Sequence, residues 1–161
     1  MNTPAHLLIG WAAFGRTHSF YIAVAALIGA LLPDLSLYLM AGTSLLLLDI
    51  PTSVVFGDLY YSVAWQTVFA IDNSFIVWGA LLGLAVVAKK DWAMALCGAA
   101  LLHLALDLPL HHDDGRAHFW PVSNWIFENP VSYWRPTTIP VALLLVIEAV
   151  VIIPGYFWTF E

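Results

Sequence analysis

The chain has 161 residues, of which 61% are hydrophobic and only 10% are charged, whereas soluble globular domains carry about 25% charged residues. This composition excludes an ordinary soluble domain and predicts an integral membrane protein. The net charge is −6 and the chain has only five Lys and Arg residues, which excludes nucleic acid as a partner because phosphate binding requires clustered basic side chains.

Five apolar segments follow one another along the chain, and we expect each of them to be helical. Several approach the ~20 residues that a helix needs to cross a bilayer. The segments are predicted at residues 4–16, 19–32, 71–88, 92–110 and 137–160. The first is short, and it has neither a basic start nor a small-residue cleavage site, so we expect it to remain as a helix and not to be a removable signal peptide. The expected fold class is an all-α membrane-embedded helical bundle, with residues 1–161 forming a single domain.

Two stretches between the second and third segments are less regular. Pro33 and Asp34 interrupt the second segment, since proline lacks the N–H that a helix interior requires. Residues 35–48 are expected either to continue this helix at an angle or to lie near the membrane surface. Residues 49–72 are rich in aromatic side chains but broken by polar ones. Because Trp and Tyr prefer the membrane–water boundary, these residues are predicted to form an interfacial segment and not a membrane span.

Basic residues in short loops predict how the helices are oriented. Lys89 and Lys90 join the third and fourth segments, and Arg16 joins the first two. Such residues tend to stay on the cytoplasmic side, so the other ends of these helices lie at the outer face, where many of the polar side chains gather. This outer layer is predicted to contain His6, Asp34, Asp72, Asn73, His103, Asp107, His111, His112, Asp113, Asp114 and His118.

The stretch LLHLALDLPLHHDDGRAHFWP, residues 101–121, contains four of the six histidines. His103 and Asp107 are four residues apart, so a helix projects them from the same face. An imidazole and a carboxylate placed in this way are either two ligands of one metal ion or a ligand with its hydrogen-bonding partner. The alternative is a His–Asp hydrogen bond that only holds helices together. Ionisable residues inside a membrane usually have a function, and the convergence with His6 and Asp34 favours a metal site.

Three short motifs carry a resemblance to a known family. They are HLLIG at residues 6–10, IGALLPDLS at 28–36, and HLALDLPL followed by HFWPVSNW at 103–125. Their order resembles the membrane-bound metal-dependent hydrolase family, also described as LexA-binding inner-membrane hydrolases, and is distantly similar to the His and Asp spacing of zinc-dependent phospholipase C. The resemblance implies a bacterial-type inner (plasma) membrane location and four metal ligands: His6, Asp34, His103 and Asp107.

The sequence departs from the family pattern at two places. The family often has a second aspartate two residues after the Pro-Asp aspartate, where this chain has Ser36. A histidine-containing segment usually opens the third helix, whereas residues 70–75 here read AIDNSF and supply Asp72. Asp72 is therefore a candidate oxygen ligand, and the alternative is a loop histidine that folds back to complete the site: His111, His112 or His118.

The function expected from these features is hydrolysis. A divalent metal ion, expected to be zinc, lowers the pKa of a bound water molecule and polarises a carbonyl or phosphoryl oxygen. At the outer membrane face the substrate is expected to be a lipid ester or phosphoester, which makes membrane lipids the expected partners. Asp72 or His118 is the expected general base, and the sequence does not choose between them.

Two other functions remain open at this point. The first is a non-catalytic accessory or structural subunit of a larger membrane protein complex, which the missing histidine of the third helix favours. The second is a pigment- or haem-binding protein that uses His103 as an axial ligand, although an aspartate one turn away makes this less favourable.

Overall fold

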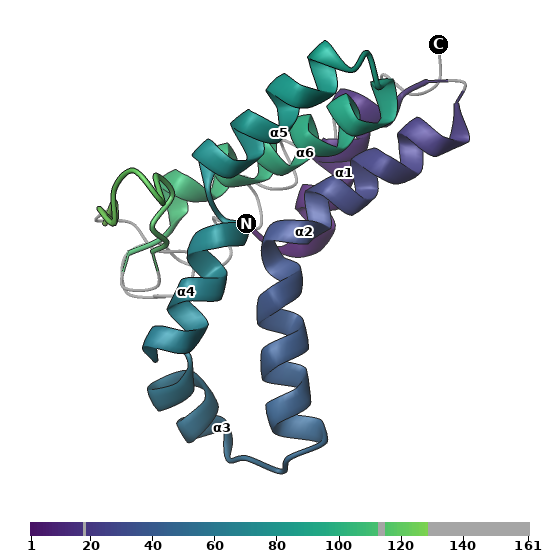
Figure 1. The fold of residues 1–161 in the computed structure, drawn as a ribbon. Helices are drawn as coiled ribbons and strands as arrows, with labels where there is room; N and C mark the ends of the chain where they lie inside the picture. The colour runs from purple at the N-terminus through teal and green to yellow at the C-terminus, as the bar shows by residue number, and fades with distance from the viewer. Residues whose placement is uncertain (18, 113–114, 129–161) are drawn as a thin grey trace.

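The computed structural model describes residues 1–17, 19–112 and 115–128. Every regular element in these ranges is a helix, so the predicted all-α fold is confirmed (Figure 1). The apolar segment expected at residues 137–160 lies outside the described residues.

Three helical stretches of the described chain are long and apolar enough to cross a membrane. The first is α2, Phe20–Leu46. The second, Val63–Val87, joins α4, Val63–Asp72, to α5, Phe75–Val87. The third is α6, Asp91–Asp107, which continues into the short η3, Leu108–Leu110. Their lengths and composition agree with the membrane protein that the composition predicts.

The N-terminal helix is short, as expected. It consists of α1, Thr3–Gly10, followed by one turn of π-helix, η1, Trp11–Gly15. Asn2 caps α1, because its Oδ1 accepts a hydrogen bond of 3.0 Å from the Ala5 N–H, and Pro4 lies in the first turn, where a missing N–H costs nothing.

The second helix does not end at Pro33. It runs through this residue to Leu46, so the predicted interruption is wrong and the alternative, continuation at an angle, is correct. Figure 1 shows α2 bending near its middle, as expected where proline removes one backbone hydrogen bond and crowds the preceding turn. Asp34 therefore projects from a helix and not from a loop.

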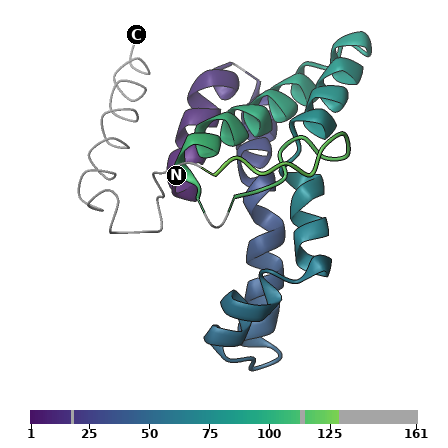
Figure 2. The same ribbon diagram turned by 90° about the vertical axis from the view of Figure 1, so that its left-hand side faces the viewer.

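Residues 49–72 are more helical than the predicted interfacial segment. They contain α3, Thr52–Val54, then η2, Val55–Leu59, and then α4, which contacts α2. We call residues 34–46 of α2 together with α3, η2 and α4 the arm, because Figures 1 and 2 show them extending away from the other helices.

Serines that look like breaks in the sequence are helix caps. Ser62 Oγ accepts from the Trp65 N–H at 3.4 Å at the start of α4. Ser74 Oγ accepts from the N–H groups of Ile76 and Val77 at 3.1 Å each, so α5 begins at Phe75 and not at residue 71. Polar residues at N-cap positions thus begin a new helix within an apolar run.

Small residues allow α2 and α6 to approach closely. Ala26 and Ala30 of α2 pack on Ala95 and Ala99 of α6 in a buried cluster. A Cβ atom added at Gly29 would lie 2.0 Å from the Leu96 carbonyl oxygen, so only glycine fits there. Close backbone approach through small residues is typical of membrane helix pairs, and it brings the Ala30 carbonyl within reach of His103.

The connection from η1 to α2 and the turn from α5 to α6 lie at the same end of the bundle in both views (Figures 1 and 2). Arg16, Lys89 and Lys90 belong to these connections. The sides of the membrane on which these ends lie remain a prediction.

Candidate metal centre

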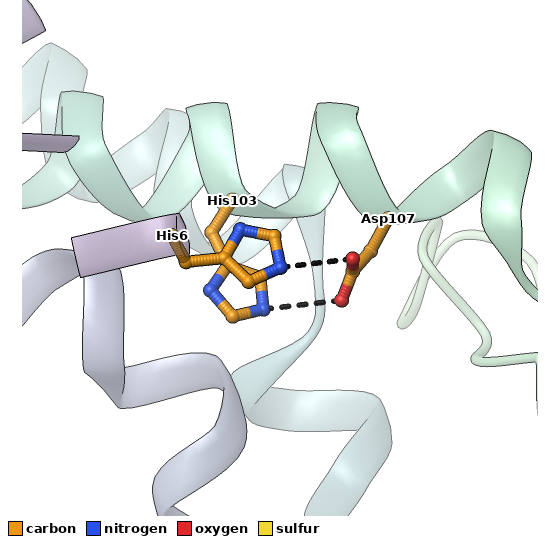
Figure 3. Close-up of side chains that lie close together, drawn as sticks. All are labelled: His6, His103 and Asp107. Atoms are coloured by element: carbon orange, nitrogen blue, oxygen red, sulfur yellow. Dashed lines mark hydrogen bonds and ion pairs between the residues drawn. The ribbon is translucent and has the colours of Figure 1, made fainter. Parts of the chain in front are cut away.

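Three buried side chains from two helices meet at the other end of the bundle (Figure 3). His6 comes from α1, and His103 and Asp107 come from successive turns of α6. His6 Nε2 lies 2.9 Å from Asp107 Oδ1, and His103 Nε2 lies 3.3 Å from Asp107 Oδ2. Their exposed fractions are 1%, 2% and 9%. This group can hold a metal ion, since each residue offers a ligand atom and these atoms all lie within 4.8 Å of one another.

The two imidazole rings are stacked, with centroids 3.6 Å apart and planes inclined by 13°. Burial lowers the pKa of His6 below its ordinary value, the hydrogen bond to Asp107 opposes this shift, and the nearby His103 adds to it. His6 is therefore neutral at pH 7. A neutral imidazole is the form that binds metal ions.

The backbone orients the His103 ring. His103 Nδ1 lies 2.7 Å from the Ala30 carbonyl oxygen, which can only accept, so Nδ1 donates. Nε2 is buried and is directed at carboxylate oxygens of Asp107 at 3.3 Å and Asp34 at 3.7 Å. A histidine held by a carbonyl group at one nitrogen and directed at carboxylates with the other is arranged as metal-binding histidines often are.

Asp34 is held in place by a short chain of hydroxyl groups. Thr3 Oγ1 donates to Asp34 Oδ2 at 2.5 Å. Because this bond uses the only hydrogen of the threonine hydroxyl, the Tyr38 hydroxyl, also at 2.5 Å, donates to Thr3 Oγ1. Partners of this kind orient metal-binding carboxylates. The four residues that the resemblance implies as ligands, His6, Asp34, His103 and Asp107, are thus neighbours.

Two ligand atoms that each lie 2.0–2.1 Å from Zn²⁺ are about 3.3–3.4 Å apart at tetrahedral angles. His103 Nε2 is 3.3 Å from Asp107 Oδ2 and 3.7 Å from Asp34 Oδ1. The group whose ligand atoms all lie within 4.8 Å of one another consists of His6, His103 and Asp107, so Asp34 lies beside this group and not within it. The Met1 amino group also contacts Asp107 Oδ1.

Two histidines of the loop after η3, His111 and His118, lie near the cluster. His111 Nε2 lies 3.4 Å from Asp107 Oδ2, which makes His111 an additional candidate ligand, whereas His112 is half-buried beside it. His118 is 4% exposed, and its Nδ1 donates to the Asn73 carbonyl oxygen at 2.8 Å. Burial lowers the pKa of His118, with the hydrogen bond to Asn73 opposing the shift, so His118 is neutral at pH 7.

Asp72 lies apart from the cluster. Its Oδ1 accepts from Asn73 Nδ2 at 2.7 Å, and its carbonyl oxygen accepts from Trp78 Nε1 at 2.7 Å. Asn73 Nδ2 also donates to the Pro33 carbonyl oxygen at 3.2 Å. Among the described residues, no ion pair joins Asp72 to the histidines of the cluster. Asp72 therefore touches Asn73, whose carbonyl oxygen in turn accepts from His118.

A cavity of about 580 Å³ opens beside the cluster, between the N-terminus of α1, the arm and the loop after η3. Its polar wall contains Asp34, Asn73, Asp107, His111, Arg116 and His118, and its apolar and aromatic wall includes Leu37, Tyr38, Ala41, Phe56, Tyr60 and Tyr61. Asp72 does not line it. The carboxylates of the cluster thus face a space large enough for part of a lipid molecule.

Sequence reasoning missed Thr3, Tyr38 and Arg116. Tyr38 follows Asp34 by four residues, so it shares a helix face with Asp34 once the helix is allowed to continue through Pro33. Thr3 precedes His6 by three residues and shares its face in the same way. No sequence signal distinguishes Arg116 from a solvated loop arginine, because its surroundings come from the arm.

Comparisons of the chain with models of protein families, with curated proteins and with solved structures find no match. The resemblance to the hydrolase family therefore rests on the short motifs alone.

Proposed function

We propose that the protein is a membrane-bound, metal-dependent hydrolase that cleaves a lipid ester or phosphoester at the outer face of a bacterial-type inner membrane. The proposal takes the motif resemblance as its starting point, and the grouping of His6, Asp34, His103 and Asp107 beside a cavity supports it. Zinc is the proposed ion, because two imidazoles and two carboxylates at these separations suit its tetrahedral coordination.

A single observation carries the metal part of the proposal. His6, His103 and Asp107 form a buried group in which each residue offers a ligand atom and these atoms lie within 4.8 Å of one another. Within this group, His103 donates through Nδ1 to the Ala30 carbonyl oxygen and directs Nε2 at Asp107. This arrangement suits a histidine that binds a metal ion with one nitrogen while its other nitrogen is held by a carbonyl group.

The bound ion would supply a water molecule of lowered pKa and would polarise the scissile carbonyl or phosphoryl group. The side chains around it have separate roles. His118 donates through Nδ1 to Asn73 and lines the cavity, so its Nε2 is the proposed general base. Asp72, which bonds the Asn73 amide, is a positioning residue in this proposal, because it holds the segment that orients His118.

The environment of the cavity supports a lipid substrate. Part of its aliphatic and aromatic lining, Leu37, Tyr38 and Ala41, comes from α2, which is apolar enough to cross a membrane, whereas its polar lining includes the carboxylates Asp34 and Asp107. A ligand with an apolar tail and a polar ester group matches both walls. A haem ligated by His103 is not supported, because the His6 ring covers one face of that imidazole and carboxylates face its Nε2.

The test is turnover by the full-length protein purified in an uncharged detergent, with short-chain lipid esters and phosphoesters as substrates. We expect a chelator to abolish turnover and Zn²⁺ to restore it. Asp107→Asn should lower turnover at least about 100-fold, whereas the matched control Asp91→Asn, at the exposed opposite end of the same helix, should retain it. Stoichiometric metal without turnover of any such substrate would refute the hydrolase and favour the accessory-subunit alternative.

A further inference from the structure

Arg116 is held against the arm by two aromatic rings. Its guanidinium carbon lies 4.1 Å from the centroid of the Phe69 ring and 4.8 Å from that of the Tyr60 ring. Both rings are buried, with exposed fractions of 1% and 8%. Aromatic faces attract a guanidinium without using its hydrogen-bond donors. The arm therefore holds the Arg116 guanidinium in place.

The described residues do not fill the hydrogen-bonding capacity of this guanidinium. Nη1 of Arg116 is buried and has no hydrogen-bond acceptor among the described residues. Within the same ranges, no carboxylate forms an ion pair with it. A buried donor that stays unpaired costs free energy, and the cost is larger for a charged group. A hydrogen-bond acceptor on a ligand bound in the cavity would satisfy this donor.

The place of Arg116 in the molecule indicates where this acceptor comes from. Arg116 lines the same cavity as Asp34, Asp107 and His118. It is one of only five Lys and Arg residues in a chain of net charge −6, and among the described Lys and Arg residues it alone lines the cavity. A ligand that reaches Asp34 and Asp107 therefore meets a positively charged side chain in the same cavity.

We propose that Arg116 is a specificity-determining residue that binds the phosphoryl group of an anionic lipid phosphoester in this cavity. The planar guanidinium donates two parallel hydrogen bonds to phosphate oxygens, while the aliphatic and aromatic wall accommodates the acyl chains. This inference rests on the proposed function, because it assigns the cavity to the substrate. It narrows that function from esters in general to phosphate-bearing lipids.

The test is calorimetric binding to the full-length protein in an uncharged detergent. The probes are dihexanoyl phosphatidic acid, uncharged dihexanoylglycerol and inorganic phosphate. We expect phosphatidic acid to bind at least about tenfold more tightly than dihexanoylglycerol. Arg116→Gln should weaken binding of phosphatidic acid by about 10- to 100-fold and leave dihexanoylglycerol unaffected. The matched control Arg16→Gln, at the exposed opposite end of the bundle, should bind as the unaltered protein does.

Arg116→Lys keeps the charge but loses the planar pair of donors, so it is expected to fold and to bind phosphatidic acid about tenfold more weakly. If inorganic phosphate binds as tightly as phosphatidic acid and depends equally on Arg116, the anion site is supported and its source is free phosphate, not lipid. Unchanged affinity for phosphatidic acid in both Arg116 variants would overturn the proposal.

A separate titration with Zn²⁺ distinguishes this inference from the proposed function. Arg116→Gln should bind Zn²⁺ with unchanged affinity, since Arg116 is not a ligand. Absence of Zn²⁺ binding by the unaltered protein together with binding of phosphatidic acid that depends on Arg116 would refute the metal-dependent hydrolase and retain the anion site. Normal Zn²⁺ binding with no effect of the Arg116 variants on lipid binding would retain the metal-dependent hydrolase and refute the anion site.

Discussion

Replacement of Thr3 by valine removes one hydroxyl group from the candidate metal centre and leaves the shape of the side chain almost unchanged. The Thr3 hydroxyl donates to Asp34 at 2.5 Å and accepts from Tyr38 at 2.5 Å. A hydrogen bond to a charged group contributes about 1.5–3 kcal/mol. The Asp34 carboxylate would lose the donor that fixes its orientation, and the Tyr38 hydroxyl, which belongs to a half-exposed side chain, would turn to water.

The expected effect of Thr3→Val is a 10- to 100-fold loss of Zn²⁺ affinity, the usual range for a residue that orients a metal ligand. Competition with a chromophoric chelator on the purified protein measures this affinity. Thr43→Val, a matched change at an exposed position of α2, should leave it unchanged. A Thr3→Val affinity within twofold of the unaltered protein would refute the role of Asp34 as a metal ligand held by Thr3.

Three further outcomes follow from other parts of the structure. Gly29→Ala should lower the free energy of unfolding by about 1–3 kcal/mol in a thermal or denaturant assay, since the new Cβ lies 2.0 Å from the Leu96 carbonyl oxygen. In the control Gly42→Ala, in the same helix, the new Cβ meets nothing within 4 Å, so this variant should not destabilise the protein. The folded-state pKa of His118 lies below its ordinary value because of burial, so its neutral form persists below pH 6.5. Turnover should therefore fall only as the pH drops through this lowered pKa. A decline in turnover that begins above pH 7 would contradict the role of His118 as general base. In a Cys97→Ala background, Lys90→Cys and Val122→Cys should be labelled from opposite sides of the membrane, and labelling of both from one side would contradict the orientation.

Much of the fold was predictable because hydrophobic composition and helical length depend only on local sequence. The helix at residues 91–110 and the short first helix follow from their apolar runs. The path of residues 35–72 was not predictable in the same way. Pro33 is usually a helix breaker in water, whereas in α2 the helix continues with a bend, and Ser62 and Ser74 cap helices where the sequence suggests polar interruptions.

The site was predictable to the extent that it depends on helix periodicity. His103 and Asp107 share a face of α6 wherever that helix lies. They meet His6 and Asp34 as the predicted polar layer implies, although Asp34 lies within α2 and not at its end. The partners of these residues depend on tertiary approach. The Ala30 carbonyl reaches His103 only because small side chains bring α2 close to α6.

The metal content of the purified protein tests the central claim most directly. Elemental analysis after Zn²⁺ loading and removal of free ions is expected to find about one ion per chain. The same measurement on Asp107→Asn should find little or none, because each oxygen of Asp107 faces one of the two buried imidazoles, while Asp91→Asn should match the unaltered protein. If the folded, unaltered protein retains no zinc and no other divalent metal ion, His6, His103 and Asp107 form only a hydrogen-bonded cluster and the metal-dependent account is contradicted.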